Sequence, residues 1–451
     1  MNKAIMTSGP MFSTLVKFSL PMIIVSILQM LFHTADTAVL GIMSGDAEVA
    51  AVGACGSLIS LLLCLVMGYA SAANVVVSKR IGEQNVERAR QATGTALILG
   101  VLSGVLLMVV VVALSRYFLI WTNCQPEILD MADLYMKIYF LGMPITMLYN
   151  FTASILRASG DSVSPMIYMI ISGVANVLLN VVFVAFLGMT VDGVALATVL
   201  SNGIALALSL IKLVKNKDYC KIEVKNFRLQ KDDTLEMLAI GFPSCLSGLA
   251  FYLGEVIVVS AVNSISTDAM TANAISAQID RINYTVGSAI ASANGVIVAQ
   301  NFGARKFDRI KKIITIGSIY CMAVTMLLGI VEVVLADVFI GIFTDSNAIV
   351  ELTKDRLILV ALTNFITTNM EIFSNSVRAL KRPRVLFVVG VTCGLSIRAG
   401  WALFIWPLCG TLPFLFICFP LSTFVGTIIH AVVTKKSITR EEAFVQSEMS
   451  I

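Results

Sequence analysis

Long apolar stretches separated by short polar gaps recur along the whole chain of 451 residues. A helix that crosses a bilayer needs roughly 20 mostly apolar residues. Twelve stretches reach this length, so we predict an all-α membrane protein with twelve transmembrane helices. Their approximate limits are 14–40, 50–78, 92–115, 130–156, 163–187, 191–214, 236–262, 270–300, 312–335, 350–376, 385–407 and 411–434.

The same pattern occurs twice, with six predicted helices on each side of the longest polar segment. Because six is an even number, both halves enter the membrane from the same side and form a parallel repeat. At a constant offset of 221 residues, Gly82 matches Gly303 and Arg157 matches Arg378. We predict two pseudo-symmetric six-helix bundles, with an N-lobe at 1–214, a basic cytoplasmic linker at 215–235, a C-lobe at 236–434 and a cytoplasmic tail at 435–451.

The placement of positive charge predicts the orientation in the membrane. When the gaps are assigned alternately to two sides, 26 of the 32 Lys and Arg residues fall on the side of the N-terminus and four on the other. Cytoplasmic loops carry the excess of Lys and Arg, so both termini are predicted to be cytoplasmic. We expect a multi-pass protein of the cell (inner) membrane.

Composition narrows the class further. Hydrophobic residues make up 57% of the chain and charged residues 13%, with a mean hydropathy of +0.89. A soluble protein of this size needs more polar surface than that. The nine cysteines include no C-x-x-C pair, and we interpret them as small buried hydrophobic residues. No P-loop is present, so direct use of ATP is not expected.

Three stretches resemble the multidrug and toxic compound extrusion (MATE) transporters. The first is the opening span, which contains Leu20-Pro21 and Asp36-Thr37. The second is the pair VVVSKRIGEQNVERA and VIVAQNFGARKFDRI, and the third is LRASGDSVSP at 156–165. The resemblance covers essentially the full chain. It implies a two-lobe transporter with a central V-shaped cavity that expels organic cations in exchange for H⁺ or Na⁺.

Asp36 is the candidate ion-coupling residue of the N-terminal half, with His33 one turn earlier on the same helical face. A charge within the membrane is costly and therefore suggests a function. A proton and a cationic drug would compete for one buried carboxylate, which is the minimal requirement for exchange. In the alternative interpretation, Asp36 is a structural carboxylate bonded to a neighbouring helix, and His33 pairs with a neighbour.

Asn176 and Asn180 are four residues apart and share one face of the fifth predicted span, while Asn150 lies in the fourth. The resemblance implies that an N-x-x-x-D stretch of the fifth span works with the first-span Asp in one branch of the family. Here Asn180 stands where that branch has Asp, which leaves Asp36 as the one carboxylate of this cluster. Simple amide packing between helices is the alternative.

The C-terminal half offers Glu255, Asp280, Arg281 and Glu371. Glu255 resembles the acidic residue that other MATE branches use to bind cations, and a sodium site near Asp36 or Glu255 is a further option. We expect Asp280 and Arg281 to form a structural ion pair, with each other or with other partners. Glu371 occupies the repeat position of Asn150.

We therefore expect a secondary antiporter without enzymatic activity and without a cofactor other than the coupling ion, H⁺ or Na⁺. Its expected partners are cationic amphiphilic small molecules and membrane lipids, without nucleic acid, and we expect a monomer. The alternative is a flippase for lipid-linked saccharides, whose relatives share the two-bundle plan. A flippase needs a cationic cavity for a pyrophosphate, whereas few Lys or Arg residues lie within the spans.

Overall fold

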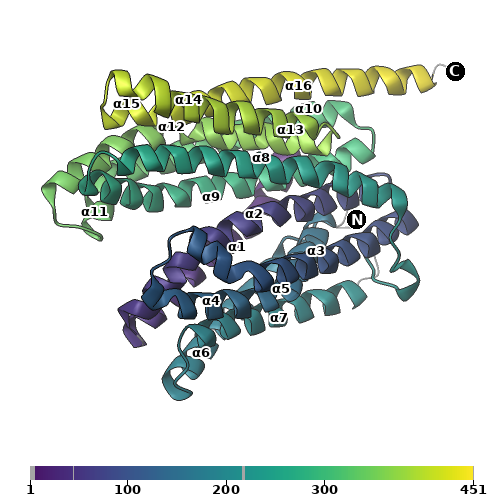
Figure 1. Ribbon diagram of the computed structural model, residues 1–451. Coiled ribbons are helices and arrows are strands. Elements are labelled where there is room, and N and C mark those ends of the chain that lie inside the picture. Colours follow the sequence, from purple (N-terminus) through teal and green to yellow (C-terminus); the bar gives the residue numbers. More distant parts are fainter. Residues whose placement is uncertain (1–5, 44, 216–218, 450–451) are drawn as a thin grey trace. The chain divides into compact units, whose positions relative to one another are not determined.

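The computed structural model describes residues 6–43, 45–215 and 219–449, apart from the side chains of 33–40, 42, 43, 46, 224, 448 and 449. Its regular elements there are all helical, which confirms the predicted fold class (Figure 1). The α-helices are α1 (Met11–Met43), α2 (Asp46–Gly82), α3 (Val86–Trp121), α4 (Pro126–Leu141), α5 (Met143–Ala158), α6 (Val163–Val181), α7 (Val191–Lys215), α8 (Lys231–Asn263), α9 (Thr267–Gly303), α10 (Phe307–Val334), α11 (Ala336–Gly341), α12 (Asn347–Ala379), α13 (Arg384–Val389), α14 (Arg398–Gly400), α15 (Leu412–Phe416) and α16 (Cys418–Met449). Short π-helical turns lie at Val182–Phe186, Gly390–Ile397 and Trp401–Ile405, and 3-10 turns at Val224–Asn226 and Trp406–Leu408.

The described helices agree with the predicted number of spans. Eleven are long and apolar enough to cross a membrane, and the bent pair α4 and α5 brings the number to twelve. These two helices meet at 47° and together fill the predicted span 130–156. Pro144 at the start of α5 explains the break, because proline has no backbone N–H to donate to the preceding turn.

The internal repeat appears directly in the helix limits. The helices α2 and α9 begin at residues 46 and 267, which are 221 residues apart. They end at residues 82 and 303, which are also 221 residues apart. The same offset relates the start of α3 to that of α10, at 86 and 307. It also relates the combined range of α4 and α5, 126–158, to α12, 347–379. The two halves are therefore structural repeats, as predicted.

Contacts divide the chain into two compact units. The N-unit contains residues 24–241, and the C-unit contains residues 6–23 and 242–451. The division falls inside α1 and α8, close to Pro21 and Pro243, which lie within these helices. The domain limits drawn above from the hydrophobic pattern stay a prediction.

The first turns of α8 are held in the N-unit by ion pairs. Arg80, at the end of α2, donates to Asp233 Oδ1 from Nη2 at 2.7 Å and from Nε at 3.0 Å. Lys79 Nζ donates to Glu236 Oε1 at 3.1 Å. In the C-unit, the repeat positions of Lys79 and Arg80 are Gln300 and Asn301, which bind the backbone of Met6. The same two repeat positions thus form ion pairs in the N-unit and amide hydrogen bonds in the C-unit.

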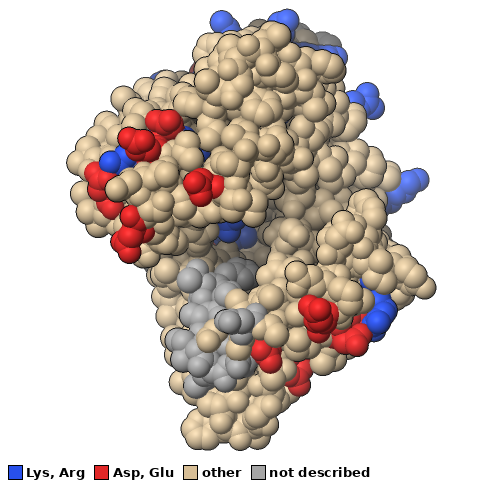
Figure 2. Space-filling model, turned by 60° about the vertical axis from the view of Figure 1, so that its left-hand side comes forward, with Lys and Arg blue, Asp and Glu red and all other residues tan. Residues whose placement is uncertain are grey.

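Large apolar side chains cover the outside of the helices. Leu106 on α3, Leu327 on α10 and Phe404 near α14 are all more than half exposed. Uncharged residues also cover most of the face in Figure 2, where Asp and Glu gather in a few places. An aqueous surface does not sustain apolar area of this extent. The chain is a multi-pass membrane protein.

Candidate functional site

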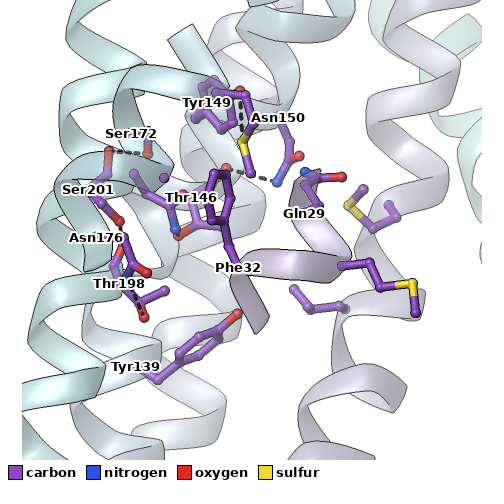
Figure 3. Close-up of a pocket in the computed structure, with 16 residues that line it drawn as sticks. Gln29, Phe32, Tyr139, Thr146, Tyr149, Asn150, Ser172, Asn176, Thr198 and Ser201 are labelled. Carbon is purple, nitrogen blue, oxygen red and sulfur yellow. Dashed lines mark hydrogen bonds between the residues drawn. The ribbon is translucent and has the colours of Figure 1, made fainter. Parts of the chain in front are cut away.

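A pocket of about 300 Å³ lies within the N-unit, between α1, α2, α4, α5, α6 and α7 (Figure 3). Its size falls at the lower end of small-molecule sites. The lining combines hydroxyl and amide groups with aromatic and sulfur-containing side chains. The described lining residues are Gln29, Met30, Phe32, Leu63, Met67, Tyr139, Thr146, Tyr149, Asn150, Met169, Ser172, Gly173, Asn176, Thr198, Ser201 and Asn202.

Hydrogen bonds between helices hold the polar wall of the pocket. Ser172 Oγ on α6 donates to the carbonyl oxygen of Ser201 on α7 at 2.7 Å. Asn202 Nδ2, also on α7, donates to Thr146 Oγ1 on α5 at 3.2 Å. Each donor and acceptor comes from a different helix, so the wall has a fixed arrangement before any ligand binds. Figure 3 shows Ser172, Ser201, Asn176 and Thr198 together on one side of the pocket.

The predicted amide residues reach this pocket in part. Asn150 and Asn176 both line it, and Asn150 Nδ2 donates to the carbonyl oxygen of Thr146 at 3.0 Å. Asn180 Nδ2 lies 3.5 Å from Asn176 Oδ1, one turn along α6. Asn180 is fully buried behind Asn176 and does not belong to the described lining. The structure therefore brings the three asparagines into one region of the N-unit.

Aromatic side chains of the pocket were not identified from the sequence. Tyr139, Tyr149 and Phe32 come from three different helices, and Tyr149 is held by its hydroxyl, 3.7 Å from Met169 Sδ. A Cβ at Gly173 would overlap the ring of Phe32, so α1 and α6 approach closely only because position 173 is glycine. The one sequence signal was this glycine inside an apolar span, which is typical of close helix packing.

No charged residue occurs among the described residues that line the pocket. Asp36 and His33 belong to α1, but their side chains lie outside the described residues. The part of α1 that is described contributes Gln29, Met30 and Phe32 to the pocket. The described wall thus supplies dipoles and ring faces rather than full charges.

Glu255 lies in the C-unit and is paired. Arg398 Nη1 donates to Glu255 Oε2 at 3.0 Å, and Arg398 Nε lies 3.3 Å from Ser422 Oγ. The Arg398 guanidinium also stacks over the rings of Phe251 and Phe419. The side chain of Glu255 is 42% exposed, whereas that of Arg398 is 9% exposed. Glu255 is therefore a counter-ion of a buried arginine.

Asp280 and Arg281 were expected to pair with each other or with other partners, and Asp280 follows the second alternative, because Arg356 acts on it electrostatically. Arg281 is exposed, and it makes no ion pair with Asp280 in the described part of the chain. Neighbouring residues of a helix do not face each other, so their charges diverge. Asp280 Oδ1 instead accepts a hydrogen bond from Asn364 Nδ2 on α12 at 3.2 Å.

Two further acids, Glu371 and Glu332, lie within helices of the C-unit. Glu371 lies on α12 and interacts electrostatically with Arg378, two turns further along. Glu332 on α10 is 7% exposed and was not identified from the sequence. The available signal was a single acidic residue inside the apolar run of that predicted span. Of the predicted residues, the structure brings together Asn150, Asn176 and Asn180 in the N-unit and lets Glu255 act on Asp280 in the C-unit.

Comparison with known proteins agrees with this architecture. The family model described as MatE matches residues 21–182 and 243–401. The probable multidrug resistance protein YoeA of Bacillus subtilis is 26% identical over 374 residues, which are 80% of each chain. The multidrug export protein MepA of Staphylococcus aureus (strain NCTC 8325 / PS 47) is 23% identical over 351 residues, which are 76% of each chain.

Solved structures share the fold at low sequence identity. A MOP superfamily transporter from Pyrococcus furiosus superposes with a TM-score of 0.89 at 20% identity, over 97% of this chain and 98% of that one. The Vibrio cholerae MATE transporter VcmN in its bent form gives a TM-score of 0.87 at 18% identity, over 96% and 98%. At such identities the similarity establishes the fold alone.

Proposed function

The chain belongs to the MatE family of multidrug efflux transporters, and from this premise we propose that it exchanges inward H⁺ or Na⁺ for outward organic cations by alternating access. The observation that carries this proposal is the pocket of the N-unit. It is large enough for part of a small aromatic drug, and it lies inside a bundle of membrane-spanning helices.

The pocket suits an organic cation in its chemistry. The ring faces of Tyr139, Tyr149 and Phe32 attract a cation through their quadrupoles. Met30, Met67 and Met169 adapt to ligands of different shape, because the thioether side chain is flexible and polarizable. Amides and hydroxyls orient the ligand without binding it as tightly as a fixed counter-charge would. Such a surface accepts many substrates and also releases them.

Asp36 is the proposed coupling residue, with His33 beside it. In the sequence, Asp36 follows the pocket residue Phe32 by four positions. Burial favours a neutral carboxyl group, whereas a nearby cation favours the carboxylate. A proton and an organic cation therefore exclude each other at this group. Glu255 is a weaker candidate for a sodium site, because Arg398 already neutralises it.

Ethidium transport by reconstituted protein tests the proposal. Vesicles that contain the protein receive a proton gradient or a sodium gradient, applied separately. One of the gradients should drive ethidium movement, and Asp36→Asn should abolish it while the protein remains folded. Ethidium movement that ignores both gradients, or that survives in Asp36→Asn, would contradict the antiport mechanism or the role of Asp36, respectively.

The flippase interpretation is not favoured. A pyrophosphate ligand would need Lys or Arg side chains, and none occurs among the described lining residues of the pocket. We further propose that the protein acts as a monomer within lipid, on cationic amphiphilic compounds, with no enzymatic step and no cofactor other than the coupling ion.

A further inference from the structure

A second polar group lies in the C-unit, where α9, α10 and α12 meet. It consists of Asp280 and Asn283 on α9, Glu332 on α10 and Asn364 on α12. Asn283 Nδ2 lies 3.3 Å from Glu332 Oε2 and 3.2 Å from the carbonyl oxygen of Thr325. Asn364 Nδ2 donates to Asp280 Oδ1 at 3.2 Å. Asp280 and Asn283 share a face of α9, because they are three residues apart.

Glu332, Asn283 and Asn364 are buried and Asp280 is partly exposed, and one atom of the group lacks a partner. Glu332 is 7% exposed, and Asn283 is completely buried. Asn283 Oδ1 accepts no hydrogen bond from any of the described residues. Buried oxygens of this kind are normally satisfied by a donor or a cation. The amide of Asn283 contacts Glu332, so this oxygen belongs to the same polar group.

The other half of the repeat shows that the fold does not require this group. At the offset of 221, the counterparts of Asp280, Asn283, Glu332 and Asn364 are Ile59, Leu62, Val111 and Met143. All four are buried parts of an apolar core in the N-unit. The same three-helix arrangement is therefore built with hydrocarbon in one unit and with two carboxyl groups in the other. A structural role alone does not explain why such costly groups are present.

The charges around the group leave an excess of one negative charge when both carboxyl groups are ionised. Arg356 on α12 interacts electrostatically with Asp280, donates from Nη1 to Ser276 Oγ at 2.7 Å and stacks over the ring of Phe416. The carboxyl groups of Asp280 and Glu332 also influence each other. Glu255 acts on Asp280 from α8 but is balanced by Arg398. Arg281 points outward and is exposed. Arg356 thus acts on Asp280 and Glu255, whereas the charged group that acts on Glu332 is Asp280.

We propose that Asp280 and Glu332, together with Asn283 and Asn364, form a buried binding site for one monovalent cation, H⁺ or Na⁺. A single positive charge removes the excess negative charge. A protonated Glu332 still accepts the hydrogen bond from Asn283 Nδ2 through its carbonyl oxygen, since a neutral carboxylic acid keeps acceptor capacity. A sodium ion would use the same oxygens. The binding itself does not depend on the proposed efflux activity, whereas its use as a coupling site rests on that proposed function.

Infrared titration of the purified full-length protein tests the site directly. The readout is the C=O stretching band of a protonated carboxylic acid, recorded across a pH series in choline buffer and again after NaCl is added at fixed pH. The variants are Glu332→Gln and Asp280→Asn, which keep the shape of each side chain. Glu351→Gln is the matched control, because Glu351 is an exposed acid on α12. Thermal unfolding verifies that each variant is folded.

In the wild type we expect a component of the carboxylic-acid band, separate from that of Asp36, that disappears as the pH rises, and Glu332→Gln and Asp280→Asn should lack this component over the same pH range. The control should keep the band. Loss of the band through pH alone identifies the cation as a proton, and its loss on addition of Na⁺ shows that sodium competes for the same oxygens. A band whose intensity and pH dependence are unchanged in both variants would overturn the proposal.

The variant Glu332→Val separates function from structure. It gives position 332 the residue type found at its repeat counterpart in the N-unit, which is Val111. We expect it to fold and to lose the band. If Glu332→Val, Glu332→Gln and Asp280→Asn all fail to fold, the group is structural and the proposal is wrong. A band that changes as expected, with neither gradient driving ethidium transport, would support the cation site and contradict the antiport mechanism.

Discussion

Arg398 Nη1 donates a hydrogen bond to Glu255 Oε2 across 3.0 Å, and this joins a buried arginine to a half-exposed acid. The arginine loses more of its hydration than the acid, since its side chain is 9% exposed and that of Glu255 is 42% exposed. Glu255 therefore has a structural reason to be present, whether or not it also binds ions.

A double-mutant cycle on this pair should reveal the dependence of Arg398 on its partner. Glu255→Gln should lower the free energy of unfolding by about 1–2 kcal/mol, because a buried charge loses its counter-ion while Glu255 is partly screened by solvent. Arg398→Gln should lower the free energy of unfolding by less in the Glu255→Gln background than in the wild type. Thermal unfolding of the four proteins measures this coupling. Additive effects would show that the two side chains do not stabilise each other.

Gly173 should tolerate no larger side chain. In Gly173→Ala the new Cβ would overlap the ring of Phe32, and overpacking of this kind costs about 1–3 kcal/mol. Ethidium efflux should fall as the pocket wall shifts. Gly53→Ala is the control, because open space surrounds Gly53 on α2. That change should leave stability unchanged or raise it by up to about 1 kcal/mol. Equal stability losses in both variants would contradict the close approach of α1 and α6.

The ion pair between Arg80 and Asp233 should stabilise the N-unit. Both side chains are less than a tenth exposed, and Asp233→Asn removes the shortest ion pair of Arg80, which keeps Glu83 and Glu236, so the change should lower the free energy of unfolding by about 1.5–3 kcal/mol. The exposed pair of Arg116 and Asp130 offers a comparison, and Asp130→Asn should cost under about 1 kcal/mol. Chemical or thermal unfolding in detergent compares the two. Similar losses would show that burial does not decide the strength of these pairs.

Tyr149 should contribute a ring face to ligand binding. Tyr149→Leu should weaken ethidium binding by about 2- to 10-fold, which corresponds to a cation–π energy of roughly 0.5–1.4 kcal/mol. Tyr149→Phe should keep most of the affinity, because the ring remains. Tyr117→Leu serves as the control, since Tyr117 is 70% exposed on α3 and lies outside the pocket. Ethidium fluorescence with the purified variants measures the affinity. Equal ethidium affinity in Tyr149→Leu and the wild type would show that this ring does not contribute to binding.

Much of the architecture was available from the sequence. The length of each apolar stretch fixes a span, because lipid leaves the backbone no partner except its own helix. The offset of 221 residues between Arg157 and Arg378 predicted a repeat, and the limits of α2 and α9 show the same offset at both ends. The sequence also identified Asn150 and Asn176, because polar residues inside a span are few and therefore conspicuous.

Only the tertiary structure decided which polar groups meet. Asp280 binds Asn364 instead of its neighbour Arg281, and Glu332 meets Asn283 across two helices. These contacts depend on how each helix is rotated and where it crosses its neighbours, and that is set by packing at positions such as Gly173. Hydrophobic periodicity gives little information about the rotation of a helix that faces lipid on one side and protein on the other, because both sides are apolar. The sequence determined what crosses the membrane, and the packing of the helices determined what lies together inside it.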